Sequence, residues 1–460
     1  MKRIIALLAL TVLLVSMLGA CGSKPNSSAA ADFTEPETGF DTETPVTITF
    51  YHQMGAALQE ILNTAIADFN KIYPNITVNH ATYGDYDGVR DQIKTEIPVG
   101  NQPNLAYCYP DHVALYNVAG AVQPLDSLIN GKYGFTEEEK ADFIQAYYNE
   151  GTAFGDGKMY TLPVSRSTEV LYYNETFFQK HNLTVPTTWE EMEAVCRQIK
   201  AIDPNCIPLG YDSEANWFIT MCEQYGSEYT STEGEKFLFD NDTNKAFVKM
   251  FQGWYKEKLV TTQELSGGYT SDLFKGKDSG TRCYMCIGST GGATYQQPTQ
   301  TNGKFDFEVG ITTIPQVNPE QPKVISQGPS LCIFKKQNAQ EVLASWLFAK
   351  FLTTDVVFQA SVSMNNGYAP VIQSVKQNEI YAEFLDSAST ANIQAYAVKV
   401  ALDQTDAYYV SPAFNGSSVA RDQVGLLMQK CMASEAANLD EAINTAFKEA
   451  VAECKYQSGM

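Results

Sequence analysis

A run of hydrogen-bonding side chains interrupts an otherwise apolar stretch of this 460-residue chain. Residues 160–175 read YTLPVSRSTEVLYYNE, with Ser-Arg-Ser-Thr where a buried strand carries apolar side chains. Ser165 and Ser167 share one face of such a strand, because side chains alternate along it. Arg166 and Thr168 share the other face. These groups either satisfy backbone groups at a strand end or contact something that is not protein.

The sequence offers no pattern typical of an enzyme active site or a metal site. A G-x-S-x-G nucleophile elbow is absent, and the four histidines and scattered cysteines have no zinc-binding spacing. Cys283 and Cys286 have redox spacing, but without a following helix we interpret them as buried structural residues. Nine of the ten cysteines follow Cys21, so at least one is unpaired, and a Cys196–Cys206 disulfide remains open. We expect no metal and no cofactor.

The first residues are typical of a secretory signal. Lys2 and Arg3 precede an apolar run over residues 4–18, and the small residues Gly19 and Ala20 follow. The run is shorter than the roughly 20 residues that span a bilayer as a helix. We therefore expect a signal peptide over residues 1–20 and a protein that lies outside the cytoplasm.

The residues around Cys21 resemble a bacterial lipoprotein cleavage box, Leu-Gly-Ala-Cys. The resemblance implies cleavage before Cys21, acylation of that residue, and anchoring to the outer face of the cell membrane. A plain signal peptide with an incidental cysteine is the alternative. Residues 21–44 are rich in Ser, Ala, Thr, Pro and Glu, which predicts a flexible tether.

The charge balance bears on the partners. The formal net charge is −21, and loss of Lys2 and Arg3 with the signal makes it −23. Nucleic-acid binding needs basic surfaces, so this balance argues against it. It does not argue against a neutral small molecule.

The elements that position these residues alternate between strands and helices. Residues 46–50 alternate apolar and Thr, and residues 58–72 carry apolar side chains at helical spacing before Pro74. Strand, helix and strand with crossover lengths predict a parallel α/β sheet. Further strands are expected over residues 76–81 and 105–109, a hairpin turn at 155–158, and helices from Thr188 (in a capping box with Glu191) to Ile199, over 339–352 and over 439–452.

Six motifs in order cover nearly the whole mature chain: VTITFYHQMG, ADFNKIYPNITV, LPVSRSTEVLYYNETFF, TTWEEM, VGITTIP and NNGYAPV. Together they resemble the family 1 extracellular solute-binding proteins of ABC importers, the group that contains maltose-binding and glycerol-3-phosphate-binding proteins. The resemblance implies a type II periplasmic-binding-protein-like α/β fold: two lobes, three hinge crossings and a ligand cleft between the lobes. Lobe one would hold residues 45–162 and 326–361, and lobe two residues 163–325 and 362–460.

The same resemblance implies a function. A small-molecule solute, a sugar or a polyol phosphate, would close the hinge of a monomeric protein, and an ABC permease would recognise the closed form. An enzyme is not expected. Two other classes stay open: a glycosidase, for which Asp111 and Glu169 could be imagined as the two carboxylates, and an adhesin or sensor with the same fold.

The resemblance also implies which residues line the cleft. Residues 160–175 would form the first crossing, with Ser165 and Ser167 toward the ligand. The remaining candidates are Tyr86 and Asp111 in lobe one, Trp217, Ser289 and Thr290 in lobe two, Gly328 at the second crossing and Tyr368 after the third. Alternatives stay open: Tyr86 could lie in a surface loop, Asp111 could cap a helix, and Trp217 could pack in the core.

A departure from the glycerol-phosphate binders concerns the solute. Those proteins carry an Arg near a C-terminal glycine-rich stretch, whereas SPAFNGSSVAR has none before Arg421 here. A phosphate without a guanidinium partner loses its strongest contact. We therefore expect a neutral sugar or oligosaccharide, with glycerol 3-phosphate or a glycerophosphodiester as the alternative if Arg421 reaches the cleft.

Overall fold

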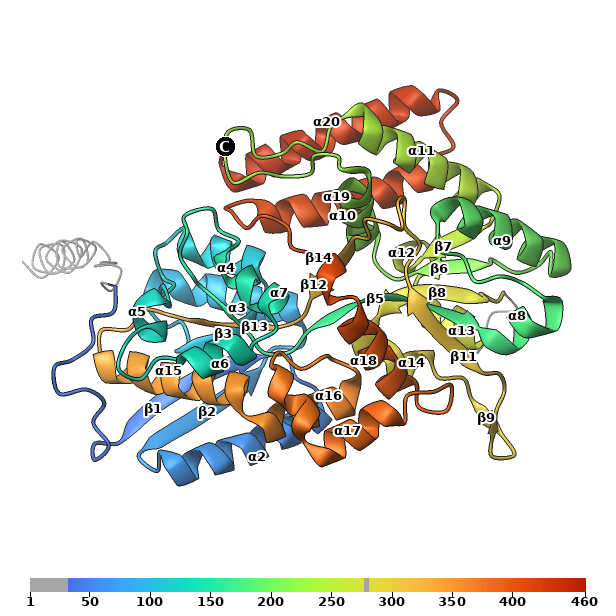
Figure 1. The fold of residues 1–460 in the computed structure, drawn as a ribbon. Coiled ribbons are helices and arrows are strands. Elements are labelled where there is room, and N and C mark those ends of the chain that lie inside the picture. Colours follow the sequence, from blue (N-terminus) through green and yellow to red (C-terminus); the bar gives the residue numbers. More distant parts are fainter. Residues whose placement is uncertain (1–31, 277–280) are drawn as a thin grey trace, which may run out of the picture.

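Two β-sheets, each covered by helices, form two lobes that lie side by side (Figure 1). The computed structural model describes residues 32–276 and 281–460. We call the lobe built on the first strands lobe one and the other lobe two. The expected two-lobed α/β architecture is confirmed.

Lobe one begins with the strand–helix–strand unit that the apolar pattern predicts. Strand β1 (Val46–His52) pairs in parallel with β2 (Ile76–Thr82) and with β3 (Leu105–Cys108). Helix α2 (Ala56–Ile72) connects the first two strands and ends before Pro74, as expected. The predicted parallel sheet is therefore confirmed.

Two more strands complete the five-stranded sheet of lobe one in the order β2-β1-β3-β13-β4. They are β4 (Leu162–Pro163) and β13 (Ser330–Ile333), which pair in antiparallel fashion. The other elements that pack here are α3 (Tyr86–Glu96), η1 (Ile97–Val99), α4 (Pro110–Asn117), α5 (Asp126–Ile129), α6 (Glu137–Asp142), α7 (Gln145–Tyr148), η2 (Asn149–Thr152), α15 (Ala339–Thr354), α16 (Val356–Asn366), η4 (Gln373–Gln377) and α17 (Glu379–Asp386).

The sheet of lobe two is built around β5 (Ser167–Asn174), which pairs with three strands. The order is β14-β12-β5-β8-β6-β7, with β11 also beside β5. These strands are β6 (Leu209–Tyr211), β7 (Val260–Thr262), β8 (Met285–Ser289), β11 (Val309–Thr313), β12 (Val324–Gln327) and β14 (Tyr408–Tyr409), and a separate hairpin pairs β9 (Gln300–Thr301) with β10 (Lys304–Phe305).

Helices cover this second sheet, and the capping box predicted for one of them is present. Thr188 accepts from the backbone of Glu191, and the Glu191 carboxylate accepts from the backbone of Thr188, at the start of α9 (Trp189–Ile202). The other helices are α8 (Glu175–His181), α10 (Glu214–Tyr225), α11 (Asp242–Lys256), α12 (Gln263–Ser266), α13 (Thr270–Lys275), η3 (Thr290–Gly292), α14 (Ala293–Gln296), α18 (Ile393–Asp403), η5 (Thr405–Ala407), α19 (Ser417–Met432) and α20 (Leu439–Ser458).

The chain passes between the two sheets at two clearly defined places. The first crossing lies between β4 and β5, and the second lies between β12 and β13 at Gly328 and Pro329. Arg166 touches both: its Nη1 donates to the carbonyl oxygen of Pro329 at 2.7 Å. Its backbone also pairs with Ala369, with N···O distances of 2.9 and 2.6 Å. Three distant segments therefore meet at Arg166.

The third crossing is predicted at residue 362, and the packing of the elements that follow bears on its position. Val371 and Tyr381 are buried in the core of lobe one, whereas Ile393 and Ala397 of α18 pack against β-strands of lobe two. Figure 1 shows α18 between the two lobes. The lobe boundaries stay a prediction, and we propose that the third crossing lies between α17 and α18.

The described part of the predicted tether lies on lobe one. Asp32 forms an ion pair with Lys335 at 2.8 Å, and Phe40 is 7% exposed within the apolar core of lobe one. The backbone N–H of Phe40 donates to the hydroxyl of Tyr133 at 2.9 Å. Residues 32–44 therefore differ from the flexible tether that their composition indicates. Cys21 lies outside the described residues, and its lipidation stays a prediction.

Several other expectations have a structural outcome. The glycines at 155 and 157 form a turn, but a 3₁₀ helix precedes it, so the predicted hairpin is wrong.

All nine cysteines within the described ranges are buried and free, including Cys196 and Cys206. In that same part of the chain, no cluster of His, Cys, Asp and Glu could hold a metal ion. No helix within residues 32–276 or 281–460 is long and apolar enough to cross a membrane.

Candidate ligand-binding cleft

Two adjoining cavities lie where the lobes meet, and the side chains of Gln327 and Arg421 line both of them. The larger cavity has a volume of about 650 Å³ and the smaller one about 80 Å³. The larger volume falls within the range of small-molecule sites. The cavities receive residues from both lobes and from the second crossing, which is the position expected for a ligand cleft.

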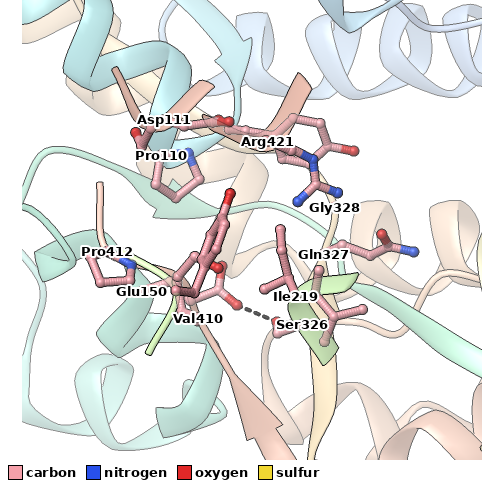
Figure 2. Close-up of a pocket in the computed structure, with 15 residues that line it drawn as sticks. Pro110, Asp111, Glu150, Ile219, Ser326, Gln327, Gly328, Val410, Pro412 and Arg421 are labelled. Atoms are coloured by element: carbon pink, nitrogen blue, oxygen red, sulfur yellow. Dashed lines mark hydrogen bonds between the residues drawn. The ribbon is translucent and has the colours of Figure 1, made fainter. Parts of the chain in front are cut away.

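The smaller cavity is bounded by lobe one on one side and lobe two on the other (Figure 2). In Figure 2 the Arg421 guanidinium points into the space between Asp111 and Gln327. The lining residues are Tyr109, Pro110, Asp111, Glu150, Ile219, Tyr229, Ile325, Ser326, Gln327, Gly328, Val410, Ser411, Pro412, Ser417 and Arg421.

Several hydrogen-bond donors gather at this cavity. The hydroxyl of Tyr229 is buried and has no hydrogen-bond partner among the described residues, although the residue lines the cavity. Helix α19 begins here with Ser417, and its N-cap Gly416 provides no side-chain cap. A helix N-terminus carries partial positive charge and free N–H groups. Donors therefore approach the cavity from Tyr229, α19 and Arg421.

The larger cavity lies mainly on lobe two. Its lining combines carboxylate, amide, hydroxyl and aromatic groups: Glu169, Asp212, Ser213, Asn216, Gln263, Tyr269, Ser271, Asp272, Lys275, Ser289, Gly291, Gly292, Tyr295, Gln296, Gln327, Tyr368 and Arg421. Tyr269 and Tyr295 are 62% and 68% exposed, so both rings are open to solvent. These two rings border the cavity on its solvent side.

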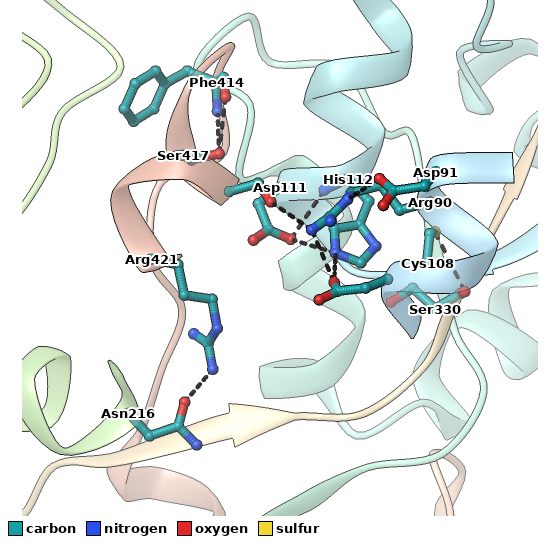
Figure 3. A network of polar contacts seen from close by, with 12 residues as sticks. Arg90, Asp91, Cys108, Asp111, His112, Asn216, Ser330, Phe414, Ser417 and Arg421 are labelled. Carbon is teal, nitrogen blue, oxygen red and sulfur yellow. Dashed lines mark hydrogen bonds and ion pairs between the residues drawn. The ribbon is translucent and has the colours of Figure 1, made fainter. Parts of the chain in front are cut away.

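A chain of hydrogen bonds connects a buried carboxylate to Arg421. Tyr211 donates its hydroxyl hydrogen to Glu169 Oε2, and Asn216 Nδ2 donates to Glu169 Oε1 at 2.8 Å. Asn216 Nδ2 also donates to Gln327 Oε1 at 3.0 Å, and Arg421 Nη2 donates to Asn216 Oδ1. Figure 3 shows the Arg421 side chain extended toward Asn216. Burial raises the pKa of Glu169 to about 7.

The lobes touch directly beside the smaller cavity (Figure 3). Arg90 of α3 lies 3.4 Å from the hydroxyl oxygen of Ser418 on α19, and it forms ion pairs with Asp87 and Asp91 at 2.8 and 2.9 Å. Burial, followed by the like charges of Asp87 and Asp111, raises the pKa of Asp422. The N-terminal part of α19 is therefore the contact between lobe two and lobe one on this side.

The structure brings half of the expected site residues to the cavities. Asp111 and Gly328 line the smaller cavity, Ser289 and Tyr368 line the larger one, and Arg421 lines both. The hydroxyl oxygen of Ser289 accepts from the backbone of Gly291 at 3.1 Å, which leaves its O–H free to donate. Gly328 has a φ of 130°, and an added Cβ would lie 2.5 Å from the carbonyl oxygen of Ser165. Contact between the crossings therefore requires glycine at this position.

The other half does not line either cavity. Ser165, Ser167 and Thr290 are buried between the crossings, where Thr290 Oγ1 accepts from the backbone of Thr168 at 3.3 Å. Tyr86 packs against Tyr109, which lines the smaller cavity, with 4.4 Å between the ring centroids. The Tyr86 hydroxyl is buried without a hydrogen-bond partner in the described chain. Among the described residues these four side chains line neither cavity, and their assignment to the ligand stays a prediction.

Trp217 differs most from the expectation. Its side chain is fully buried and stacks on Tyr211 at 4.7 Å, with Phe251 on the other side at 4.0 Å. Helix α10 is buried over most of its length, so its aromatic residues pack in the core of lobe two. The polar Asn216, one residue earlier, faces the cavity instead.

Sequence reasoning missed several lining residues. Tyr109 and Glu150 of lobe one, Tyr229 and Asn216 of lobe two, and Gln327 at the second crossing line the cavities. A signal existed for Gln327, which directly precedes Gly328. No local pattern marks Glu150 or Tyr229, since both reach the cavity through tertiary packing.

Comparison with known proteins identifies the family. The family model of the bacterial extracellular solute-binding proteins matches residues 64–392. The sn-glycerol-3-phosphate-binding periplasmic protein UgpB of Agrobacterium fabrum is 25% identical over 351 residues, which cover 74% of this chain and 77% of that protein. UgpB of Escherichia coli K12 is 21% identical over 339 residues, covering 71% of this chain and 75% of that protein.

Solved structures have the same fold. UgpB from Mycobacterium tuberculosis, in complex with glycerophosphocholine, matches with a TM-score of 0.72 at 17% identity and covers 90% of this chain and 100% of that chain. The cyclic alpha-maltosyl-1,6-maltose binding protein from Arthrobacter globiformis matches with a TM-score of 0.69 at 17% identity and the same coverage. Since the family model spans most of the chain and the two-lobed fold agrees with it, this protein belongs to the bacterial extracellular solute-binding proteins, a family of binding proteins and not of enzymes.

Proposed function

We propose that this chain is a lipid-anchored extracellular substrate-binding protein of an ABC importer. It captures a sugar or an oligosaccharide between its lobes as a monomer, closes around it, and delivers it to a membrane permease. Closure requires a ligand that contacts both lobes at once. The residues that line the cavities come from lobe one, lobe two and the second crossing, which supports this mode of capture.

The balance of charges in the cleft is the observation that favours a neutral sugar. Carboxylates outnumber cations along the two cavities: Asp111, Glu150, Glu169, Asp212 and Asp272 stand against Arg421 and Lys275. Carboxylates and amides accept hydrogen bonds from sugar hydroxyls, while the carboxylates repel a phosphate dianion. Tyrosine rings at the larger cavity suit the C–H faces of a sugar.

Arg421 supports a second candidate, glycerol 3-phosphate or a glycerophosphodiester. The guanidinium lies at both cavities, near the uncapped N-terminus of α19, and has no carboxylate within ion-pair distance among the described residues. Guanidinium groups and helix N-termini both bind phosphate well. The similarity to glycerol-3-phosphate-binding relatives favours the same candidate.

Calorimetric titration of the soluble chain separates the two candidates. Maltose, maltotriose, glycerol 3-phosphate and glycerophosphocholine serve as the panel, with wild type, Tyr368→Ala and Arg421→Met. We expect binding of a maltooligosaccharide, a loss with Tyr368→Ala, and an intact melting curve for that variant. Binding of the phosphate compounds alone, lost on Arg421→Met, would support the second candidate and overturn the first.

The anchor and the permease need a cellular test. Cys21→Ser in the full-length chain should move the protein from the membrane fraction to the medium or periplasm, because the acyl chains provide the anchor. Ser23→Cys in the same background is a control for an incidental cysteine and should not restore anchoring. Membrane retention of Cys21→Ser would contradict the lipid anchor.

A further inference from the structure

Glu169 is a buried carboxyl group whose contacts lead to Arg421. The residue is 2% exposed at the wall of the larger cavity. Its two oxygens accept from the Tyr211 hydroxyl and from Asn216 Nδ2. The other end of the Asn216 amide, Oδ1, accepts from Arg421 Nη2. One amide group therefore contacts the carboxylate through its nitrogen and the guanidinium through its oxygen.

The charge on Glu169 helps to set which way this amide faces, together with Gln327 Oε1, which accepts from the same nitrogen at 3.0 Å. An ionised carboxylate only accepts hydrogen bonds, so it requires the NH₂ group of Asn216. The amide oxygen must then point toward Arg421, which only donates. A neutral carboxyl group carries a donor of its own and no longer imposes this orientation. In the reversed amide, NH₂ would face the guanidinium and no hydrogen bond could form.

We propose that Glu169 is a positioning residue of the ligand site: through Asn216 it holds the Arg421 guanidinium at the junction of the two cavities. The inference rests on the proposed function, because it gives Glu169 a part in solute binding at the same cleft. Arg421 has no other hydrogen bond to a side chain in the described ranges, so the Asn216 oxygen is the contact that fixes its position.

The surroundings of Glu169 make this relay sensitive to pH. Burial raises the pKa of Glu169 to about 7. The hydrogen bonds from Tyr211 and Asn216 and the charge of Arg421 lower this pKa, whereas the charge of Asp212 raises it. Tyr409 of β14 also faces Glu169. Burial raises the pKa of Tyr211 and Tyr409 well above the usual range, so both tyrosines stay neutral around pH 7. Burial also raises the pKa of Asp212.

The test compares affinities at about pH 8 and about pH 6, with maltotriose and glycerol 3-phosphate as probes. Wild type should lose about tenfold in affinity at the lower pH, as expected for the loss of a charge-assisted hydrogen bond. Glu169→Gln should bind weakly at both values and show no pH dependence between them. The same pH dependence in wild type and Glu169→Gln would overturn the proposal.

Glu214→Gln is the matched control. Glu214 is the first residue of α10, the helix that carries Asn216; it is 5% exposed and burial raises its pKa, but it lines neither cavity. Its substitution should leave the pH profile of wild type unchanged. In an Arg421→Met background, Glu169→Gln should have no further effect on affinity. An equal loss in both backgrounds would show that Glu169 does not act through Arg421.

A measurement without solute keeps the inference independent of the proposed ligand. Phenylglyoxal modification of Arg421, followed by peptide mass spectrometry at about pH 8, should be several-fold faster in Glu169→Gln than in wild type, because the guanidinium is released. The exposed Arg197 is the internal reference. If neither probe binds wild type, the proposed function fails on its own; unchanged modification of Arg421 would overturn the positioning role.

Discussion

Arg166 and Glu150 form an ion pair at 2.8 Å in which both side chains are almost completely buried, 1% and 4% exposed. Arg166 belongs to the first crossing and contacts the second crossing and Ala369, while Glu150 also lines the smaller cavity. The hydroxyl of Ser326, on β12, donates to the same carboxylate. Glu150, which lines the candidate ligand site, therefore forms an ion pair with Arg166, the residue at which the crossings meet.

This arrangement predicts a large loss of stability when one partner is removed. Glu150→Gln or Arg166→Met leaves a buried charge without its partner and should lower the free energy of unfolding by about 3–5 kcal/mol. Urea denaturation followed by tryptophan fluorescence measures the effect. Arg197→Met, which removes a half-exposed pair with Glu257, is the control and should cost less than about 1 kcal/mol. Equal losses of unfolding free energy in these variants and in Arg197→Met would show that the buried pair contributes no more than the half-exposed one.

The backbone conformation of Gly328 predicts that adding a side chain at the second crossing lowers the stability of the protein. Gly328→Ala adds a Cβ that would lie 2.5 Å from the Ser165 carbonyl oxygen, at a φ of 130° that L-residues rarely adopt. We expect about 1–3 kcal/mol of destabilisation, measured by urea denaturation. Gly253→Ala, in helix α11 with open space around it, should instead stabilise by up to about 1 kcal/mol. A neutral Gly328→Ala would mean that the crossings separate without strain.

Tyr269 and Tyr295 predict a preference for longer ligands. Both rings are exposed and border the larger cavity on its solvent side, where they could cover a second sugar ring. Replacing both by Ala should weaken maltotriose binding by about tenfold or more in calorimetry, and affect maltose less. Tyr456→Ala, 82% exposed on α20 and outside both cavities, is the control. Equal losses for the two sugars would assign the tyrosines to a single ring.

Phe40 predicts that the segment before β1 belongs to the folded unit. Phe40→Ala removes a side chain that is 7% exposed in the core of lobe one and should cost about 3 kcal/mol. Differential scanning calorimetry measures the loss, and a glutamate-specific protease should cleave the loosened segment after Glu37 faster. The exposed Glu43→Ala is the control and should change neither. If Phe40→Ala melts like wild type, residues 32–44 contribute no stability.

Glu169 also predicts a pH dependence of folding. Its pKa in the folded protein is raised to about 7 from a usual value near 4.5, so its neutral form is favoured on folding. The stability that this group contributes is fully present below about pH 4.5 and is lost as the pH rises through 7. Glu169→Gln should lack this loss of stability, which amounts to up to about 3 kcal/mol. Unfolding free energy measured against pH shows the difference. A parallel pH curve for the variant would contradict the assignment.

Local patterns in the sequence determined the elements and their order. The alternation of Val46, Ile48 and Phe50, the helical spacing before Pro74 and the capping box of Thr188 each act within a few residues, and the structure confirms all three. The two-lobed fold was predictable for a different reason: six ordered motifs resembled a family whose model matches the chain. Of the predicted cleft residues that line the cavities, only Tyr368 lies in one of these motifs; Asp111, Ser289, Gly328 and Arg421 were proposed from other stretches of the chain.

Only the tertiary structure decided which side chains reach the cleft. Helix α10 is buried on several sides, so Trp217 packs into the core while Asn216, its neighbour, faces the cavity. Arg421 lies 205 residues from Asn216 and meets it only because α19 folds back against α10. Periodicity tells which face of an element is apolar, but it does not tell which distant element covers that face. The sequence therefore determined the framework, and long-range packing determined the site.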